Sequence, residues 1–443
     1  LGDVYKRQPY YRSAGETADA VSLSELCEAL KKEIEIQGMS RLMFKIEQPL
    51  TEVLASMEHY GVGIDVGGVR KFGDSLVDEI GGLESQIYFM CGKEFNISSP
   101  KQLGEILHEM GVPLKKKTKT GYSTGAEILE ELRDSYPVID LILRYRQLTK
   151  LNSTYVEGLL KTVAQDGRIH TSFRQTETRT GRISSTEPNL QNIPVRTELG
   201  REMRKFFVAQ DGRTLLDADY SQIELRLVAH ICADEAMISG FADGADIHTS
   251  TAARVFGLPE EMITPEMRSA AKAVNFGIIY GIGAFSLSKD INVSVYEAKK
   301  YINDYLHKFP NVEKFMNETV EKAKKDGYVT TMFGRKRYVP ELSASNKNMQ
   351  AAGKRIAMNT PIQGSAADII KIAMVRVYGR LKKEIPEARL ILQVHDELIV
   401  ECSENDADRA AEILSEEMTH ACELKVPLIA DVNRGGSWYD AKG

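Results

Sequence analysis

The sequence has few cysteines and no long apolar run. Its five cysteines are scattered over 443 residues, and no two of them form a CxxC pair. This distribution argues against a zinc ribbon or a disulfide framework and fits a reducing cytosol, so we expect a cytoplasmic protein. No apolar stretch reaches the length of a membrane-spanning helix, and no secretory signal opens the chain. We therefore expect no membrane partner.

The chain also lacks an excess of positive charge. It carries 57 Lys and Arg against 63 Asp and Glu, for a net charge of −6, which taken alone disfavours a nucleic-acid-binding protein. The distribution points the other way, because residues 168–205 hold eight Lys or Arg and only four Asp or Glu. Such clusters are most often solvated loops, but several of them beside Gly- and Ser-rich turns suggest contact with phosphates. The other basic clusters are Lys115-Lys116-Lys117, Arg335-Lys336-Arg337 and Lys354-Arg355.

The length allows two to four domains, and neither an internal repeat nor a low-complexity segment is present. Helical patterns dominate residues 21–160, with glycines predicted to end helices at Gly38, Gly61 and Gly92. Short strands and polar turns follow Gly167, and helices return between residues 234 and 326. The basic loop at 113–125 suits a clamp on a duplex as well as it suits a plain surface loop. The opening residues LGDVYKRQ resemble nothing that follows, so we expect a fragment and leave open that they are foreign.

The stretch LILQVHDELIVE at 390–401 alternates in the manner of a half-buried strand. Asp396 falls on its apolar face, where an unpaired carboxylate would cost several kcal/mol. If His395 and Asp396 form the turn of a β-hairpin, the acid lies at the tip and avoids that burial. An aspartate at a turn is common, so this position alone does not indicate a function.

A second acid ends the stretch TLLDAD, which we expect to be a strand closing at Asp219. Ser221 and Glu224 have the S-x-x-E spacing of a capping box, which predicts that they open the next helix. Glu224 is either that cap or a functional residue.

Asp219 and Asp396 could meet at one edge of a shared sheet, where carboxylates about 4 Å apart repel by roughly 4 kcal/mol. Divalent cations would turn this repulsion into attraction, and magnesium needs few protein carboxylates.

The segment TPEMRSAAKAVNFGIIYG begins a helix with Thr264 at the cap and Pro265 at the first helical position. Met267, Ala271, Val274 and Ile278 form the predicted core stripe. A second face consists of Arg268, Lys272, Phe276 and Tyr280. Cations at one end and aromatic rings at the other suit a nucleotide, with phosphates near the cations and a base on the rings. A mixed structural surface is the alternative.

These stretches, in this order, resemble motifs A, B and C of the family A DNA polymerases, the bacterial DNA polymerase I type. DYSQIELR is similar to motif A, RSAAKAVNFGIIYG to motif B and QVHDELIVE to motif C. TGRISSTEPNLQNIPVR resembles the segment before motif A, and MNTPIQGSAADIIK the template-contacting helix. The resemblance runs from about residue 43 to the end. It implies an α+β right-hand polymerase fold, with an antiparallel-sheet palm and helical fingers.

The resemblance also implies domain bounds: an exonuclease-like remnant at 1–42, thumb at 43–165, palm at 166–231 and 345–443, and fingers at 232–344. The acidic motifs of a proofreading exonuclease lie outside this chain, so we expect no proofreading by it. We expect a monomer that extends a primer on template DNA with deoxynucleoside triphosphates (dNTPs), uses two magnesium ions and releases pyrophosphate.

Site residues carry over position by position. Asp219, Asp396 and the Tyr220 carbonyl would hold the metal ions, with Glu397 as an auxiliary acid. The second face of the predicted helix would bind the nucleotide through Arg268, Lys272, Phe276 and Tyr280, with Lys272 also catalytic. His248 and Gln222 would assist, and Glu224 would crowd the sugar 2′ position. The residues matching DNA contacts are Arg182, Gln191, Asn192, Arg355, Asn359, Gln363 and His395, to which we add Lys115, Lys116 and Lys117. A two-metal nuclease, an idle DNA-binding protein and an RNA polymerase of related fold are the alternatives.

Overall fold

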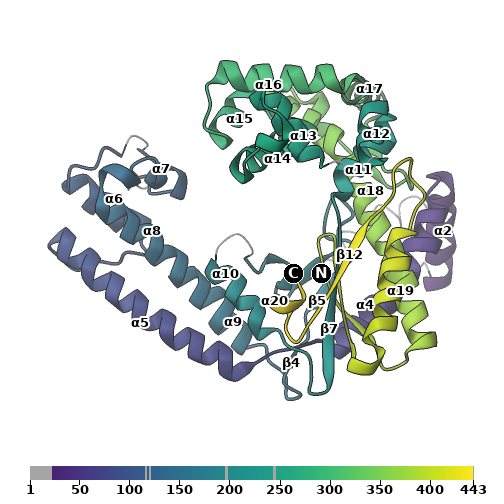
Figure 1. The fold of residues 1–443 in the computed structure, drawn as a ribbon, viewed down its shortest axis with the longest axis horizontal. Coiled ribbons are helices and arrows are strands. Elements are labelled where there is room, and N and C mark those ends of the chain that lie inside the picture. Colours follow the sequence, from purple (N-terminus) through teal and green to yellow (C-terminus); the bar gives the residue numbers. More distant parts are fainter. Residues whose placement is uncertain (1–21, 115–116, 119–120, 195–197, 243–245, 443) are drawn as a thin grey trace. The chain divides into compact units, whose positions relative to one another are not determined.

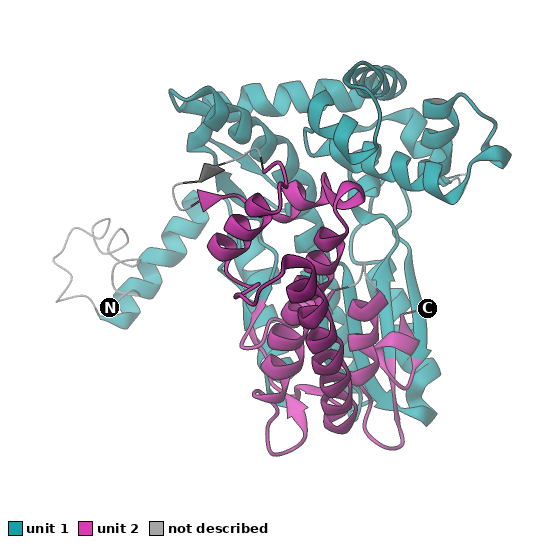
Figure 2. Ribbon diagram, turned by 90° about the vertical axis from the view of Figure 1, so that its left-hand side faces the viewer, with its two compact units in different colours: residues 1–59, 173–184, 216–434 teal, residues 60–172, 185–215, 435–443 magenta. Residues whose placement is uncertain are grey.

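The computed structural model describes residues 22–114, 117–118, 121–194, 198–242 and 246–442 (Figure 1). The chain divides into two compact units (Figure 2). Unit 1 comprises residues 1–59, 173–184 and 216–434, as far as these are described, and unit 2 comprises residues 60–172, 185–215 and 435–443. Each unit is therefore assembled from three separate stretches of chain.

Unit 1 contains most of the long helices. They are α2 (Leu23–Ile36), α3 (Ser40–Leu42), α4 (Gln48–Tyr60), α11 (Ile223–Cys232), α12 (Glu235–Ala242), α13 (Ile247–Phe256), α14 (Pro265–Ile279), α15 (Ala284–Asp290), α16 (Val295–Lys308), α17 (Pro310–Asp326), α18 (Lys347–Glu384) and α19 (Ala407–Thr419). A π-helical segment, Met43–Glu47, joins α3 to α4. Among these helices, α13 packs against α14, and α11, α17 and α19 pack against α18.

A four-stranded sheet organises this unit, with the strand order β10-β11-β7-β12. The strands are β7 (Arg213–Tyr220), β10 (Arg389–Val394), β11 (Glu397–Ser403) and β12 (Ala430–Gly435). Residues nearly 180 positions apart thus share one sheet, because β7 lies next to β11. A smaller strand pair of this unit is β8 (Tyr328–Thr330) with β9 (Lys336–Tyr338). Elsewhere in the chain, β5 (Ser172–Arg174) pairs with β6 (Ser184–Thr186).

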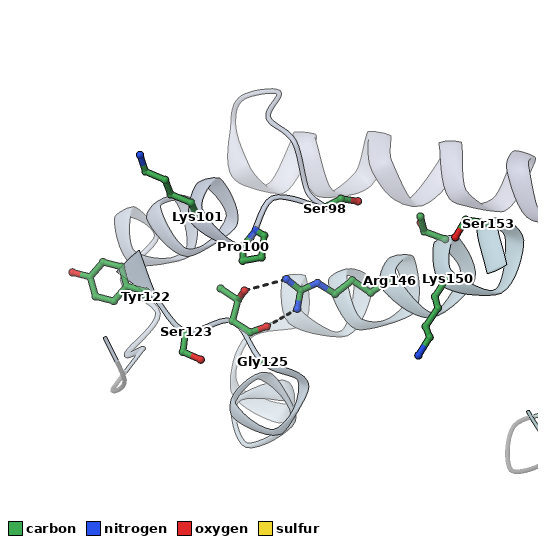
Figure 3. Close-up of a pocket in the computed structure, with 11 residues that line it drawn as sticks. Ser98, Pro100, Lys101, Tyr122, Ser123, Gly125, Arg146, Lys150 and Ser153 are labelled. Carbon is green, nitrogen blue, oxygen red and sulfur yellow. Dashed lines mark hydrogen bonds between the residues drawn. The ribbon is translucent and has the colours of Figure 1, made fainter. Parts of the chain in front are cut away.

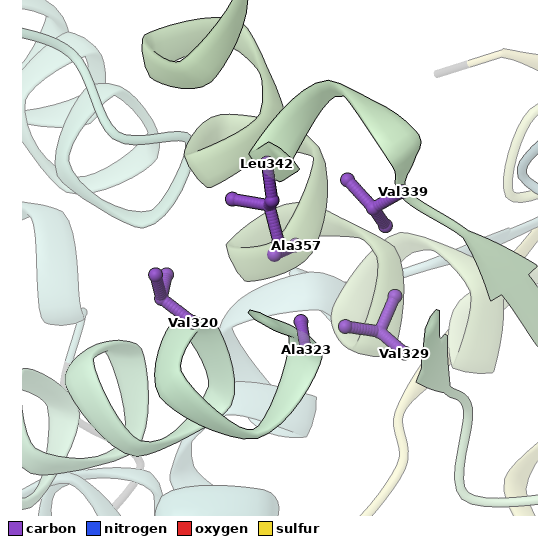
Figure 4. Packing of buried hydrophobic residues seen from close by; sticks show 6 residues of the cluster. All are labelled: Val320, Ala323, Val329, Val339, Leu342 and Ala357. Carbon is purple, nitrogen blue, oxygen red and sulfur yellow. The ribbon is translucent and has the colours of Figure 1, made fainter. Parts of the chain in front are cut away.

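The helix α18 runs for 38 residues and carries Pro361 in its interior. Proline lacks an N–H and so removes one helical hydrogen bond. Ser365 adds a contact there by donating its hydroxyl to the Pro361 carbonyl. The N-terminal half of α18 is held by a small apolar core in which Ala357 packs with Val320, Ala323, Val329, Val339 and Leu342 (Figure 4). This core fixes the segment of α18 that carries three of the predicted DNA contacts.

Unit 2 is built mainly from helices. They are α5 (Val66–Cys91), α6 (Pro100–Glu109), α7 (Ala126–Glu130), α8 (Pro137–Lys150), α9 (Glu157–Leu160), α10 (Glu198–Glu202) and α20 (Trp438–Ala441). Its strands form two short antiparallel pairs, β1 (Val62–Gly63) with β4 (Arg168–Ile169) and β2 (Lys117–Thr118) with β3 (Gly121–Tyr122). Within this unit, α8 packs along α5.

The single tryptophan of the chain anchors the C-terminal helix of unit 2. Trp438 is 1% exposed and meets Phe207 edge to face, with ring centroids 5.6 Å apart. The Arg204 guanidinium lies 3.9 Å from the centre of the indole ring, within the range of a cation–π contact. The last turn of the chain is therefore part of the core of unit 2.

The predicted helix ends are confirmed where glycine takes a left-handed conformation. Gly38, Gly61 and Gly92 have φ of 69°, 64° and 71° and follow α2, α4 and α5. Lys115 and Lys116, in the predicted basic loop, lie outside the described residues, and Lys117 belongs to β2. Among the described residues, none of the helices combines the length and apolar character that crossing a membrane requires.

Candidate active site

The hairpin predicted at 390–401 is confirmed. Val394 pairs with Glu397 in an antiparallel ladder, so His395 and Asp396 form a two-residue turn between β10 and β11. His395 takes a φ of 53°, which costs a residue with a side chain about 1 kcal/mol. Gln393 supports the turn by donating from Nε2 to the His395 carbonyl oxygen at 2.6 Å.

The expectation of a half-buried strand is wrong for this hairpin. The residues of both faces are buried, including the polar Gln393, Glu397 and Glu401. The reason is packing: α18 lies against β10 and α19 against β11, on top of the pairing with β7. Alternation in the sequence could not reveal this, since a strand covered on both faces can still carry polar residues that have partners.

The structure brings Asp219 and Asp396 to the same edge of the sheet. Asp219 is the next-to-last residue of β7, and the Tyr220 N–H donates to the Asp396 carbonyl oxygen at 3.1 Å. The main chain at the end of β7 is thereby tied to the hairpin turn. The convergence that the sequence suggested is therefore present in the fold.

This edge concentrates negative charge around Asp396. Burial, assisted by Glu224, Asp219 and Glu397, raises the pKa of Asp396 to about 7. Arg182 acts in the opposite direction but does not outweigh these causes. The carboxyl group is half-buried rather than free in solvent, so an oxygen-seeking cation would relieve an electrostatic penalty here.

The predicted capping box at the start of α11 is wrong. Gln222, not Ser221, is the residue that precedes the helix, and no side chain caps this helix end. Gln222 takes a left-handed φ of 53°, and the Ser221 N–H donates to the Ile429 carbonyl at 2.9 Å. These contacts turn the chain away from capping geometry, so Glu224 is available for other partners.

Glu224 links three parts of unit 1 instead. It is 6% exposed and accepts from Arg182 Nη2 at 2.9 Å, while the Tyr280 hydroxyl donates to its other oxygen. Burial and the neighbouring Glu224 raise the pKa of Tyr280, so this hydroxyl stays protonated and can donate. Removing Arg182 would leave the buried Glu224 charge without its cation, which is destabilising. We call the face of α14 that carries Arg268, Lys272, Phe276 and Tyr280 the α14 row. Glu224 connects this row to the sheet edge that carries Asp219 and Asp396.

The start of α14 is confirmed, with Thr264 accepting from the Met267 N–H and Pro265 at the first position. Ala271, Val274 and Ile278 are buried as predicted, whereas Met267 is only half-buried.

The residues of the α14 row differ in their exposure to solvent. Arg268 and Lys272 are exposed, and Phe276 and Tyr280 are half-buried with ring centroids 6.2 Å apart.

Asp246 belongs to this site and was missed from the sequence. Arg268 Nε donates to Asp246 Oδ2, and the Asp246 carboxylate caps α13 by accepting from the His248 N–H at 3.1 Å. Although burial raises it, hydrogen bonds from Arg268 and Thr249 lower the pKa of Asp246 to about 2. The His248 ring lies 5.9 Å from that of Phe276. The pattern D-x-H-T, an aspartate at a helix cap ahead of a histidine, was the available signal.

The end of α14 lies against α18. Gly281 takes a φ of 72°, a left-handed conformation that strains residues with a side chain, and a Cβ there would sit 2.4 Å from Met358 Cε. Arg355, Asn359 and Gln363 recur every four residues and therefore share one face of α18. Arg355 is exposed, and the buried Asn359 Oδ1 has no hydrogen-bond partner within the described part of the chain.

The remaining predicted contacts belong to unit 2. Gln191 and Asn192 end a short 3-10 turn at Leu190–Asn192, where the Tyr155 hydroxyl donates to the Asn192 carbonyl at 2.6 Å. A cavity of about 660 Å³ lies between α6, the β3–α7 loop and α8 (Figure 3). Its lining includes Lys101, Arg146 and Lys150, and Arg146 donates to the Thr124 carbonyl and hydroxyl. This cationic, hydroxyl-rich lining was not predicted residue by residue.

Comparisons with known proteins identify the family of this chain. A sequence model of DNA polymerase family A matches residues 68–440. The chain belongs to DNA polymerase family A. It is 48% identical to DNA polymerase I of Caldicellulosiruptor bescii over 95% of this chain and 50% of that protein. It is also 48% identical to DNA polymerase I of Bacillus subtilis, over 96% of this chain and 48% of the relative.

A solved member of family A has the same fold. The structure described as the POL domain of Pol1 from M. smegmatis, in complex with DNA primer-template and dNTP, matches with a TM-score of 0.91 and 42% identity. The match covers 95% of this chain and 75% of that one. The predicted α+β right-hand polymerase fold is therefore confirmed. The chain spans about half the length of the curated relatives.

Proposed function

We propose that the chain catalyses template-directed DNA synthesis. In this reaction the primer 3′-OH attacks the α-phosphate of a dNTP, and pyrophosphate leaves. The observation that supports it most is the meeting of Asp219 and Asp396 at one sheet edge, joined through Glu224 to the α14 row. The solved relative described with primer-template DNA and dNTP agrees with this substrate class.

The residues at the sheet edge fit two magnesium ions. Within the described ranges, no group of three or more His, Cys, Asp or Glu side chains could hold a metal ion. The donor set proposed here is smaller: the Asp219 and Asp396 carboxylates and the Tyr220 carbonyl oxygen, with Glu397 as a buried neighbouring acid. Magnesium tolerates few protein ligands because water and phosphate oxygens complete its shell. The raised pKa of Asp396 is the electrostatic cost that such a cation would relieve.

When bound, magnesium lowers the pKa of an attacking hydroxyl and screens the charge of a triphosphate. The chain's own residues position the reactants. Arg268 and Lys272 bind the triphosphate and balance its charge, and Lys272 stabilises the departing pyrophosphate. Phe276 and Tyr280 pack against the sugar and base.

Glu224 and Gln222 complete the nucleotide site. The Glu224 carboxylate is held by Arg182 and Tyr280, so it forms a fixed wall rather than a mobile side chain. A fixed wall beside the sugar excludes a 2′-OH, which favours deoxyribonucleotides over ribonucleotides. Gln222, at the left-handed turn before α11, lies two residues from Glu224.

DNA contacts come from two groups of residues. Arg182, Arg355, Asn359, Gln363 and His395 in unit 1 contact primer and template near the sheet edge. Asn359 Oδ1 is a buried acceptor that a nucleic-acid donor would satisfy. In unit 2, Gln191, Asn192 and the cationic cavity of Figure 3 contact the duplex, together with Lys115, Lys116 and Lys117. Such contacts position the duplex without reading its sequence.

We further propose the thumb, palm and fingers bounds given by the resemblance, with residues 1–42 as an exonuclease-like remnant. The protein acts as a monomer in the cytoplasm.

Incubating a labelled primer-template with magnesium and dNTPs tests the proposal. A longer strand supports it, a shorter strand indicates a nuclease, and an unchanged strand indicates a DNA-binding protein without catalysis. Supplying ribonucleotides separates an RNA polymerase of related fold from the proposed activity.

Two substitutions connect the activity to the sheet edge. Asp219→Ala or Asp396→Ala should abolish primer extension while leaving duplex affinity largely intact, since neither side chain is proposed to bind the duplex. Extension assays and duplex titrations on the same preparations measure both properties. Extension retained by either variant would refute the assignment of the metal site.

A further inference from the structure

A buried chain of hydrogen bonds joins α13 to α14. Thr251 Oγ1 donates to Asn275 Oδ1 at 3.0 Å, and Asn275 Nδ2 donates to His248 Nδ1 at 2.9 Å. Asn275 is 0% exposed, His248 2% and Thr251 4%. We call these three residues the relay. Each polar atom that the relay joins has a partner, as buried groups require.

The relay determines which ring nitrogen of His248 carries the proton. An amide nitrogen can only donate, so the Nδ1 atom that it contacts must offer a lone pair. A neutral imidazole then holds its one proton on Nε2. In this arrangement Thr251 donates its hydroxyl to the Asn275 amide oxygen, and the amide nitrogen faces the ring.

The surroundings keep this ring neutral. Burial lowers the pKa of His248 to about 4; the Asp246 carboxylate acts to raise it, and the cations Arg268 and Lys272 act to lower it. The Asp246 carboxylate is itself paired with Arg268, which weakens its electrostatic effect on the His248 ring. Near neutral pH, the ring therefore presents an N–H without a third positive charge.

We propose that Asn275 is a positioning residue: it holds His248 as the Nε2–H tautomer, so that the ring donates one hydrogen bond to a phosphate oxygen of the incoming nucleotide. This inference rests on the proposed function, since the α14 row supplies the neighbouring phosphate ligands. The ring stands beside Phe276 in that row, 5.9 Å between centroids. If the relay merely joined two helices, the proton on His248 would not affect nucleotide binding.

The tautomer can be read directly on the unmodified protein. Long-range ¹H–¹⁵N spectra of protein with ¹⁵N-labelled histidine distinguish a protonated Nε2 from a protonated Nδ1, and His248→Gln identifies the resonance. We expect the proton on Nε2 and a shift of that nitrogen when dNTP is added with primer-template. A proton on Nδ1, or an Nε2 resonance that dNTP leaves unmoved, overturns the proposal.

Asn275→Asp tests the consequence with a residue of the same shape. A carboxylate can only accept, so it draws a proton to Nδ1. At high pH the variant ring is then neutral with a lone pair on Nε2, whereas at low pH it is an imidazolium that donates from both nitrogens. We define the KM ratio as the KM of the variant for dNTP divided by the KM of the unmodified protein at the same pH. This ratio should be near one at pH 6 and about ten or more at pH 9.

A matched control carries the same change of charge elsewhere in unit 1. Asn303 is exposed on α16, and Asn303→Asp should leave the KM ratio near one at every pH. A ratio for Asn275→Asp that does not change with pH would indicate a structural role and overturn the proposal. Failure of the proposed function can be told apart from failure of this inference. In the first case primer extension is absent, while the spectra still report the Nε2 proton and its response to dNTP.

Discussion

Asp396 makes the metal-free protein sensitive to pH. Its pKa in the folded chain is about 7, against 3.8 for an ordinary aspartate, because burial and the surrounding acids disfavour its ionised form. Between these values the folded chain binds a proton that the unfolded chain has released. The stabilisation from that proton is complete below about pH 4 and is lost as the pH rises through 7. A shift of about three pKa units corresponds to on the order of 4 kcal/mol.

On the proposed function, magnesium that binds to Asp219 and Asp396 must displace this proton. At pH 7 about half of the chains carry it, so binding should release about 0.5 proton per chain, with about 0.9 at pH 6 and less than about 0.1 at pH 8.5. Calorimetric titration with magnesium chloride in two buffers of different ionisation enthalpy measures the number of protons released.

Two variants, each of which replaces an aspartate with an asparagine, control this experiment. Asp396→Asn should remove the pH-dependent release, while Asp408→Asn, at a side chain that is fully exposed, should preserve it. Equal release at pH 6 and pH 8.5, or unchanged release from the Asp396→Asn protein, would refute the reasoning.

Three further outcomes are expected. Glu224→Ala should admit ribonucleotides, because it removes the fixed wall and unpairs Arg182 and Tyr280; unchanged kcat/KM ratios for ribo- over deoxynucleotides would argue against this role. The family resemblance predicts that Phe276→Tyr eases dideoxynucleotide incorporation, and equal chain termination by both proteins would contradict it. Thr264→Ala should destabilise unit 1 by about 1 kcal/mol through loss of a helix cap. Thr264→Ser should retain that stability in urea unfolding, and equal losses in the two variants would exclude capping as the cause.

Local features of this site could be predicted from short stretches of sequence. Thr264 and Pro265 mark the start of α14 because capping and the missing proline N–H are local effects. The His395–Asp396 turn follows from two apolar runs separated by two residues. The adjacency of Asp219 and Asp396 is different, since no periodicity states that two distant strands pair. Two acids at predicted strand ends suggested the adjacency, and the family resemblance made it specific.

The misses arise where tertiary contacts override local patterns. Glu224 has the spacing of a capping residue, but a half-buried arginine and a tyrosine hydroxyl offer it stronger partners than a backbone N–H. Asp246 and Asn275 lie outside the predicted α14 row, and their partners come from a neighbouring helix. Such pairings depend on the crossing of α13 and α14, which the sequence does not specify.

The position of Trp438 decides what intrinsic fluorescence can report. It is the only tryptophan in the chain, and its indole ring is buried against Phe207 and Arg204 within unit 2. Tryptophan emission excited at the red edge of the absorption band will therefore follow the unfolding of unit 2. It will not report changes at the sheet edge that carries Asp219 and Asp396. A denaturation curve recorded this way should be paired with circular dichroism, whose signal is dominated by the long helices of unit 1.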